Sequence, residues 1–459
     1  MREQSSEPSA TDGRPRDAWA SIFPVKAVLL AITITVSLYS VGPVRAETAA
    51  LGPYRGGEIA RAGTRTAWQL QLPLRFTDRI ETWGLVEGLL YARFEDGTVQ
   101  AVRADTGRAA WVRSIVQPMS MLHGPTGAHM DDGVRAVVFT LINEVRVLER
   151  DTGEPIETRT TRRPNVTAAL VAENRLLLSQ SGRRFLCQRL DDDLELWAKS
   201  MPGLLEVPPI LIPLRHGPWV ACADSQGTLL VVDLQGTNRF VYELDSPPVG
   251  GLAADAHAVY VATQDRRLRA ISLATGELLW SMRLAGLPNE APVVTGDALY
   301  QATLDAGLYR VSLPEPEILP EPEDDVASLT PSEAVERRPE AQPRPDVLAG
   351  LLAMREPTHW RAPEVRRFLA EWPRRIVVQR HDGLVALMYK DDARPRTDAL
   401  LDPGTGFEGL SNAVNDAVLL TAPDGRVRCW RPVGAPPLTL EDFAPPAVPP
   451  QEDPEAETP

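Results

Sequence analysis

Apolar and polar residues alternate over short runs along most of the chain, which is the pattern of β-strands with one buried face. Two of these runs, FEDGTVQAVRADTGRAAW (94–111) and TQDRRLRAISLATGELLW (263–280), align with each other without gaps. Each contains a polar turn, an alternating strand, a Thr-Gly turn and a second strand that ends in tryptophan. The glycine stands where a tight hairpin turn needs a positive φ. This self-similarity predicts a repeat architecture.

Eight copies of the unit can be aligned on one apolar pair, which we call the anchor. The anchors are Val99/Ala101, Val145/Val147, Phe185/Cys187, Leu229/Val231, Leu268/Ala270, Leu308/Arg310, Val385/Leu387 and Val427/Cys429. Successive anchors are 46, 40, 44, 39, 40, 77 and 42 residues apart. A period of about 40 residues with several short strands is typical of a propeller blade. The prediction is an all-β chain that forms an eight-bladed β-propeller of four-stranded antiparallel blades.

The double-length gap between the sixth and seventh anchors predicts an insertion at residues 314–373. Residues 314–346 are rich in proline and glutamate and show no alternation, so we expect them to be disordered. Residues 363–372 begin with a proline and place Val365, Phe368, Leu369 and Trp372 at helical spacing, which predicts a short helix. This helix either packs on the rim of the propeller or binds a partner.

The strand TAWQLQL (66–72) ends in the pattern of a repeat but lacks the strands that should precede it. The last repeat, in turn, runs out of strand after Trp430. Because an open array of blades leaves sheet edges exposed, we expect the N-terminal strand to complete the eighth blade. The alternative is that PLTLEDF (437–443) completes it.

The N-terminal region predicts export. Lys26 precedes an uncharged, mostly apolar run at 27–41, and small residues lead to a cleavage site after Ala46. Residues 1–46 are therefore an export signal or, alternatively, an uncleaved signal anchor that attaches the protein to the membrane. In both cases the body of the chain is extracytoplasmic, either periplasmic or secreted. The expected domains are propeller blades 1–6 with the closing strand at 47–313, blades 7–8 at 374–433, and a disordered acidic tail at 434–459.

Charge is concentrated outside the repeats. The chain has a formal net charge of −14. Residues 314–346 carry ten acidic residues against three arginines, and the tail after Gly434 carries six acidic and no basic residues. The repeats are therefore close to neutral. An acidic chain without a basic stripe argues against nucleic acid as a partner.

No constellation predicts catalytic, cofactor-binding or metal-binding residues. The three cysteines, Cys187, Cys222 and Cys429, are too scattered for a disulfide framework or a zinc site, and two of them occupy anchor positions of the core. The segment at 121–133 contains several possible metal ligands, but we interpret it as a polar connection between blades. We interpret a run of three aspartates as a solvated turn. These residues are His123, His129, Asp131 and Asp132, and Asp191, Asp192 and Asp193. The other histidines, His216, His257, His359 and His381, are isolated.

Arg310 is unusual because the equivalent anchor position is small or aliphatic in the other units. A buried charge must find a partner or reach water. We interpret the arginine as the result of a local register slip beside the insertion. The alternative is that it lines the central channel and binds an anion.

The sequences AVRADTGRAAW (101–111) and AISLATGELLW (270–280) resemble the repeat of pyrroloquinoline-quinone-type β-propellers. This resemblance covers most of 66–313 and 374–433. It implies either the non-enzymatic branch, of the outer-membrane β-barrel assembly scaffold type, or the quinoprotein dehydrogenases that oxidise alcohols or sugars. The dehydrogenases typically carry a vicinal disulfide, whereas no two cysteines are adjacent here. The scaffold lipoprotein carries a lipidated cysteine after its signal, whereas Glu47 follows Ala46 here.

We therefore expect a non-catalytic scaffold without a cofactor that binds proteins in the cell envelope. The alternatives are an exported quinoprotein dehydrogenase and a propeller that binds a carbohydrate or another small ligand in its channel.

Overall fold

The computed structural model describes a large part of the chain, and the predicted signal and most of the acidic insertion lie outside that part. The described residues are 54–74, 79–115, 121–130, 133–192, 194–214, 217–313, 357–390 and 397–444. Within these ranges there is no helix with the length and apolar character needed to cross a membrane.

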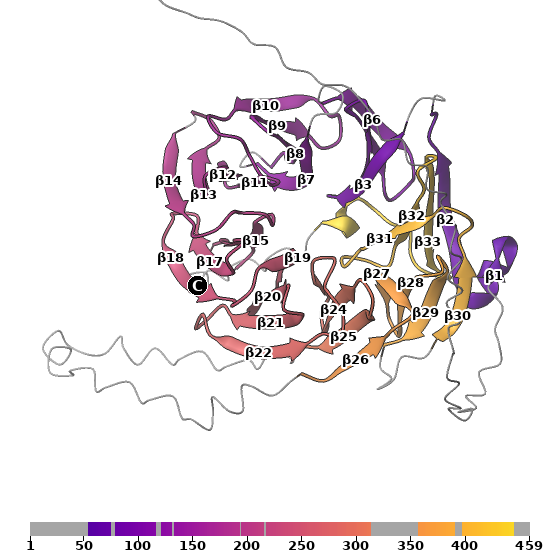
Figure 1. Cartoon of the computed structure of the whole chain (residues 1–459). Helices are drawn as coiled ribbons and strands as arrows, with labels where there is room; N and C mark the ends of the chain where they lie inside the picture. The colour runs from indigo at the N-terminus through magenta and orange to yellow at the C-terminus, as the bar shows by residue number, and fades with distance from the viewer. Residues whose placement is uncertain are drawn as a thin grey trace, which may run out of the picture. The chain divides into compact units, whose positions relative to one another are not determined.

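Eight β-sheets are arranged around a common axis as the blades of a propeller (Figure 1). In blades 1–7 the first strand lies nearest the axis and the fourth at the rim, and these four strands pair antiparallel with their neighbours. Blade 1 contains β3 (Ile80–Val86), β4 (Leu89–Phe94), β5 (Thr98–Arg103) and β6 (Ala109–Ser114). Blade 2 contains β7 (Leu122–His129), β8 (Arg135–Leu141), β9 (Glu144–Glu149) and β10 (Pro155–Thr160). Blade 3 contains β11 (Leu170–Ala172), β12 (Arg175–Gln180), β13 (Arg184–Arg189) and β14 (Glu195–Ser200). Blade 4 contains β15 (Ile210–Ile212), β16 (Trp219–Ala223), β17 (Thr228–Asp233) and β18 (Asn238–Glu243).

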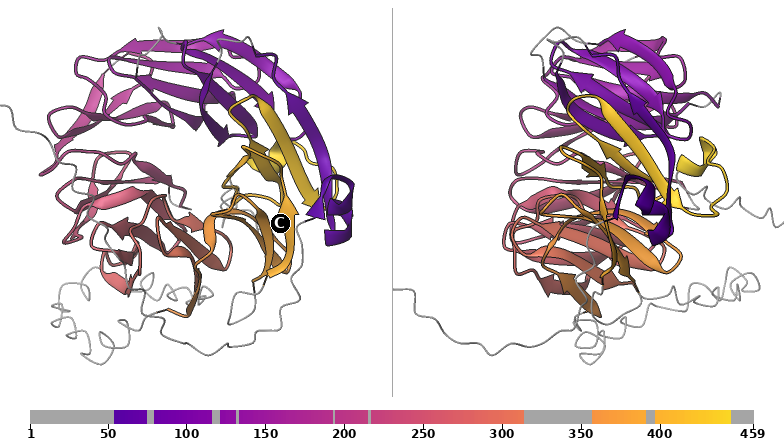
Figure 2. Two further views of the ribbon diagram at one scale, coloured as in Figure 1. Left: turned by 45° about the vertical axis from the view of Figure 1, so that its right-hand side comes forward. Right: turned by 90° about the vertical axis from the view of Figure 1, so that its right-hand side faces the viewer.

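The second half of the ring repeats this arrangement (Figure 2). Blade 5 contains β19 (Pro248–Ala254), β20 (Ala258–Thr263), β21 (Arg267–Ser272) and β22 (Leu278–Arg283). Blade 6 contains β23 (Val293–Val294), β24 (Ala298–Thr303), β25 (Gly307–Ser312) and β26 (His359–Ala362). Blade 7 contains β27 (Val365–Trp372), β28 (Arg375–Arg380), β29 (Val385–Tyr389) and β30 (Thr397–Asp402). Blade 8 contains β31 (Glu408–Leu410), β32 (Val418–Thr421), β33 (Arg426–Pro432) and, as its fourth strand, β2 (Thr64–Gln71).

The predicted eight-bladed fold is confirmed, and all eight anchor pairs lie on the third strand of a blade. In blade 4, for example, Leu229 and Val231 of β17 are both fully buried. A third strand has hydrogen-bonded neighbours on both edges, and its two faces pack against the adjacent blades. Apolar residues are therefore favoured on the third strand, as they are on the second strand, which has the same surroundings.

The N-terminal strand closes the ring, as predicted. β2 pairs antiparallel with β33, so that Trp68 lies opposite Cys429 and Leu70 opposite Val427. The alternative fourth strand, residues 437–443, is not part of the blade 8 sheet. It instead packs against the blades with buried side chains, and the predicted disordered tail therefore does not begin at residue 434.

The helix predicted over residues 363–372 is wrong, because these residues contain β27, the first strand of blade 7. The pairing of β27 with β28 shifts register twice, between Val365 and Arg367 and between Phe368 and Ala370. Each shift interrupts the alternation of the strand. As a result, Val365, Phe368 and Trp372 are all buried at spacings that imitate one face of a helix.

Blade 6 resumes after the insertion. β26 pairs with β25 as the fourth strand of this blade, with Arg310 opposite Trp360. Propeller structure is therefore already present at His359, inside the range predicted for the insertion. Residues 314–356 lie outside the described residues.

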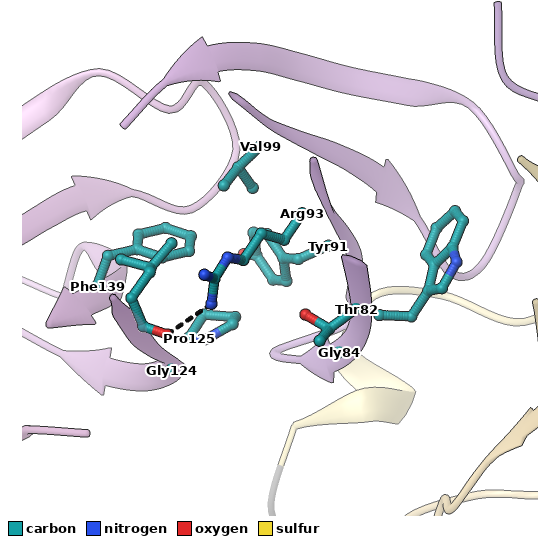
Figure 3. A pocket seen from close by; sticks show the side chains of 10 residues that line it. Thr82, Gly84, Tyr91, Arg93, Val99, Gly124, Pro125 and Phe139 are labelled. Carbon is teal, nitrogen blue, oxygen red and sulfur yellow. Dashed lines mark hydrogen bonds between the residues drawn. The ribbon is translucent and has the colours of Figure 1, made fainter. Parts of the chain in front are cut away.

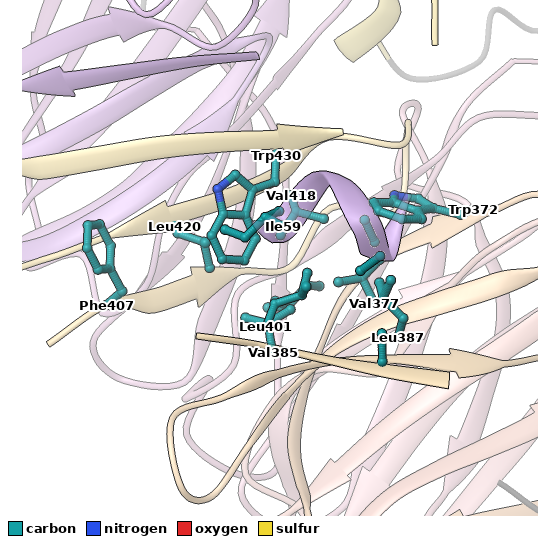
Figure 4. Close-up of a cluster of buried hydrophobic side chains, with 14 of the residues drawn as sticks. Ile59, Trp372, Val377, Val385, Leu387, Leu401, Phe407, Val418, Leu420 and Trp430 are labelled. Carbon is teal, nitrogen blue, oxygen red and sulfur yellow. The ribbon is translucent and has the colours of Figure 1, made fainter. Parts of the chain in front are cut away.

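Blade 7 carries a fifth strand, β1 (Tyr54–Arg55), which pairs parallel with the rim strand β30. The 3-10 helix η1 (Gly56–Ala62) follows it and inserts Ile59 and Ala62 into a buried cluster with Trp372 and Trp430 (Figure 4). Residues before the closing strand thus cover part of the edge of blade 7 and the seam to blade 8.

Tryptophans of the fourth strands join neighbouring blades. Trp111 of blade 1 donates its indole N–H to the Arg150 carbonyl of blade 2 at 2.8 Å. A Cβ added at Gly153 would lie 2.5 Å from the Trp111 ring. The Thr-Gly turn thus has two reasons for glycine, a positive φ of 67° and the close approach of the indole. Trp197 and Gly236 make the same contact between blades 3 and 4.

The ring has two faces, defined by its turns. The turns between second and third strands and the connections from blade to blade lie on one face, which we call the connection face. The turns between first and second strands and between third and fourth strands lie on the other, the opposite face. Turns and connections are where propellers present variable side chains on a rigid scaffold.

Candidate functional site

The possible metal ligands near residue 123 do not lie in a loop, as we expected, but partly on a strand. His123 and His129 belong to β7, the first strand of blade 2, and Asp131 and Asp132 lie outside the described residues. Burial, and to a lesser extent the charge of Arg93, lower the pKa of His123 below its usual value. Across the described ranges, no group of three or more His, Cys, Asp or Glu side chains is placed to hold a metal ion.

The run of aspartates lies at the turn between β13 and β14. Asp191 accepts a hydrogen bond from Asn174 Nδ2 at 2.6 Å, and Asp192 pairs with Arg189 at 2.9 Å. Asp193 lies outside the described residues. The two described carboxylates are exposed and have partners within their own blade, which is the arrangement of a solvated turn.

The three cysteines are buried and free. Burial raises the pKa of the Cys187 thiol to about 12, and it raises that of Cys429 to about 12 as well. Burial also raises the pKa of Cys222. Since the thiolate is the reactive form, these side chains act as small core residues.

The register slip proposed for Arg310 is wrong. Arg310 lies opposite Tyr300, just as the equivalent Ala270 lies opposite Tyr260 in blade 5. The guanidinium is nearly buried and reaches Asp297 Oδ2 at 3.2 Å and Ser312 Oγ at 3.1 Å. Arg310 is on β25, two strands away from the strand nearest the axis. Its charge is therefore balanced within blade 6.

A small cavity lies between blades 1 and 2, lined by Thr82, Tyr91, Arg93, Pro125 and other residues (Figure 3). Arg93 crosses it and donates to the Leu122 carbonyl at 2.7 Å. Its volume is about 30 Å³. This is room for about one water molecule, and a pocket for an organic ligand is usually some ten times larger. The cavity therefore does not fit a quinone or a sugar.

Exposed apolar side chains gather on the connection face of blades 2–4. Met121, Ile142 and Leu204 are 59%, 40% and 50% exposed. Met121 and Ile142 flank the paired residues Leu122 and Leu141, so they face each other across the start of β7 and the end of β8. Large apolar residues at turns have no folding role when they are this exposed, and clusters of them often mark binding sites.

Three exposed arginines lie in the same region: Arg162, Arg163 and Arg183. A Cβ added at Gly182 would lie 3.0 Å from Arg163 Nη1, so this guanidinium lies over the turn that carries Arg183. Arg183 donates to the Pro202 carbonyl at 2.7 Å. In the part of the chain that the structure describes, none of the three is paired with a carboxylate.

Main-chain hydrogen bonds connect these turns. The N–H of Asn165 donates to the Ile142 carbonyl at 2.6 Å, and the N–H of Ser181 donates to the Pro164 carbonyl at 2.8 Å. The N–H of Leu204 then donates to Ser225 Oγ at 2.9 Å. We call the resulting surface the blade 2–4 patch, and it consists of Met121, Ile142, Arg162, Arg163, Arg183 and Leu204.

The patch was missed in the sequence because its residues are far apart and belong to no motif. A usable signal was present, since Ile142 stands in a short turn and Leu204 in the connection between β14 and β15, where polar residues are the rule. Where the structure describes them, the isolated histidines add no second site. His216 lies outside the described residues, and His359 contacts the Pro357 carbonyl at 3.0 Å through Nδ1.

The fold and the tryptophan–glycine contacts define the class of protein, an eight-bladed β-propeller of pyrroloquinoline-quinone-like repeats. Residues 65–240 and 191–315 match the family described as outer membrane protein assembly factor BamB. These matches span more than half of the chain, which therefore belongs to this family.

The individual comparisons give a relative from this family and two structures of similar fold. The outer membrane protein assembly factor BamB of Alkalilimnicola ehrlichii is 31% identical over 144 residues, which are 30% of this chain and 37% of that protein. The chain thus matches little more than a third of that relative's length. The crystal structure of BamB from Moraxella catarrhalis is similar with a TM-score of 0.55 and 12% identity, over 81% of this chain and 99% of that one. The WD40 domain of SCAP from fission yeast is similar with a TM-score of 0.52 and 12% identity, again over 81% and 99%. At such identities the two structures show the fold alone.

Proposed function

We propose that this protein is a non-catalytic scaffold of the cell envelope that takes part in outer membrane protein assembly and binds a protein partner through the blade 2–4 patch. Membership of the BamB family supports the assembly role. The patch is the observation that supports the mode of binding, because it combines exposed apolar side chains with arginines. Arginine is enriched in protein interfaces, and exposed apolar clusters are typical of their centres.

The side chains of the patch indicate which residue types the bound segment of the partner should carry. Three arginines without carboxylate partners in the described structure favour a segment that carries Asp or Glu beside apolar residues. Such a segment would bury Leu204 and Ile142 and pair with Arg162, Arg163 or Arg183. The rigid blades fix the backbone of these turns, so the ordering cost on binding falls mainly on the side chains.

The test is site-specific photocrosslinking in the protein's own host. A photoreactive residue at Leu204 is expected to crosslink to a component of the outer membrane assembly machinery. Leu304 is the matched control, because it is a leucine of 57% exposure in a turn of the connection face of blade 6. A crosslink of equal yield from both positions, or from Leu304 alone, would contradict the proposal.

Charge reversal measures how much the arginines contribute to the affinity for the partner. Arg163→Glu combined with Arg183→Glu should weaken binding of the crosslinked partner about tenfold or more and reduce its salt dependence. The control is Arg283→Glu, an exposed arginine at the rim of blade 5. Unchanged affinity for the patch variant would exclude the arginines from the interface.

The non-catalytic part of the proposal has its own measurement. The absorbance spectrum of protein purified from its own host should be that of protein alone. A quinone-like band that fades when an alcohol or a sugar is added would favour the dehydrogenase alternative. Cell fractionation should place the chain in the envelope.

A further inference from the structure

The segment after the last strand is bound to the ring in a way that neither the repeat nor the proposed function requires. We call residues 436–443 the C-terminal strap. Arg65 Nη2 donates to the Ala435 carbonyl at 2.8 Å, and Arg431 donates to the Pro436 carbonyl. These contacts direct the chain away from blade 8 after β33, and the strap then crosses the opposite face toward blade 1.

Three apolar side chains anchor the strap. Leu440 is 6% exposed and packs in the cluster between blades 1 and 2, together with Leu89 and Tyr91. Phe443 is 4% exposed and packs in the cluster between blades 8 and 1, and Leu438 packs against that same cluster. The pattern Leu-x-Leu-x-x-Phe therefore contacts both the seam between blades 8 and 1 and the seam between blades 1 and 2.

The ring presents a shaped surface to the strap. Gly88, in the first turn of blade 1, has a φ of 79°, and a Cβ there would lie 3.0 Å from Leu440 Cδ2 and 3.2 Å from its carbonyl oxygen. Asn415, in the first turn of blade 8, donates from Nδ2 to the Asp442 carbonyl at 2.9 Å. The strap thus contacts both blades that β2 joins.

The strap itself ends in the 3-10 turn η3 (Glu441–Phe443), which lies close to the axis in Figure 1. Asp442 Oδ2 accepts hydrogen bonds from the N–H of Thr439 at 2.7 Å and from its hydroxyl at 3.1 Å. The strap belongs to no β-sheet. Its attachment therefore depends on inserted side chains and a few polar contacts, as that of a short bound peptide does.

We infer that the opposite face of blades 8 and 1 is a docking surface for a peptide of the pattern Leu-x-Leu-x-x-Phe, which the C-terminal strap occupies within the same chain. The strap is a detachable second closure of the ring beside β2. Gly88 is the residue that admits the backbone of this ligand.

The first experiment uses the full chain with Leu440→Ser and Phe443→Ser together, studied by hydrogen exchange with mass spectrometry. Exchange should become faster in the turns around Gly88 and Asn415, while blades 3–6 and the far-UV circular dichroism stay unchanged. Val433→Ser is the matched control, because Val433 precedes the strap and is 58% exposed. Unchanged exchange at both turns in the double variant would overturn the inference.

The second experiment supplies the ligand separately. A synthetic peptide of residues 436–444 should restore slow exchange at both turns in the double variant, and the same peptide with the two serines should not. Failure of the natural peptide to protect either turn would show that the surface does not bind it as a peptide ligand.

If the double variant does not fold, Gly88→Ala replaces it, since the added methyl group meets Leu440 while both anchors stay present. This variant should release the strap, and because alanine also strains the Gly88 turn itself, exchange is compared at the strap and at the Asn415 turn. Slow exchange of the strap in Gly88→Ala would contradict the assigned role of Gly88 and the inference with it.

Discussion

The seam between blades 8 and 1 and the seam between blades 1 and 2 use the same contact in two different situations. At both, a fourth-strand tryptophan reaches the third turn of the next blade. Trp68 donates to the Ala104 carbonyl at 3.0 Å and Trp111 to the Arg150 carbonyl at 2.8 Å. Trp111 is 7% exposed, whereas Trp68 is only half-buried.

The difference lies in what else joins the blades. The chain crosses both seams directly, from β6 into blade 2 and from β2 into blade 1. Blade 8 itself, however, is assembled from β2 and β33, which come from opposite ends of the chain. Closing so long a loop costs conformational entropy that local contacts must offset. The ladder between β2 and β33 makes this closure inside blade 8, and the C-terminal strap adds contacts at the seam from blade 8 to blade 1. The blade that is not covalently continuous is thus also held by contacts to its neighbour.

The largest expected effect is a difference in stability loss between substitutions of Trp111 and Trp68. Trp111→Ala should lower the free energy of unfolding by about 3–5 kcal/mol, the usual cost for a buried tryptophan. Trp68→Ala should cost about 2 kcal/mol, because less of its surface is buried. Urea unfolding followed by circular dichroism measures both. A greater loss for Trp68→Ala would mean that the closure seam limits the stability of the whole ring.

Alanine substitutions of the glycines that contact these indoles should give a stability loss of intermediate size. Gly107 and Gly153 have φ values of 71° and 67°, and an added Cβ would lie 2.5 Å from an indole atom. Alanine should cost about 1–2 kcal/mol for the left-handed backbone, and more because the indole must move. Gly133→Ala is the control, since its φ is 81° and nothing lies within 4 Å of an added Cβ. Equal losses at all three positions, measured by thermal unfolding, would remove the indole contact from the explanation.

The smallest expected effect depends on pH. Burial alone would raise the pKa of Asp105, but the hydrogen bonds and charge of Arg103 outweigh it, and the pKa lies below its usual value. A lowered pKa stabilises the fold above the unfolded value of about 4, and this contribution is lost as pH falls through the folded value. Asp105→Asn should therefore cost at most about 1 kcal/mol at pH 7, since Arg103 is partly exposed.

This cost should shrink in acid, as the pH falls toward the lowered pKa of Asp105. The measurement is the difference in urea midpoint between wild type and Asp105→Asn at pH 7 and at pH 3. Asp151→Asn is the control from the other seam, because 54% of the Asp151 side chain is exposed. A difference that persists unchanged at pH 3 would assign the effect to packing rather than to charge.

Much of the fold was predictable because the same strand and turn pattern occurs in several copies along the chain. The anchors predicted the third strands, and the orphan strand at Trp68 predicted the closure. The prediction failed at β27, where two register shifts gave a strand the spacing of a helix. It also failed for Leu440 and Phe443, whose burial depends on surfaces that distant blades build.

The candidate site was less predictable than the fold, because its residues are brought together only by the tertiary structure. Ile142, Arg163 and Leu204 come from three separate connections, and no spacing in the chain links them. Arg310 is a different kind of failure. From the sequence it was interpreted as a register slip, but the structure keeps the regular register there. Asp297, from the neighbouring turn, balances its charge without any change of register.

By itself, the sequence determined most of the strands, the number of blades and the strand that closes the ring, because alternation and tight turns are local properties repeated along the chain. Only the tertiary structure decided where the C-terminal strap binds and which turns form the blade 2–4 patch. Both depend on side chains that closure of the ring brings together from positions far apart in the chain.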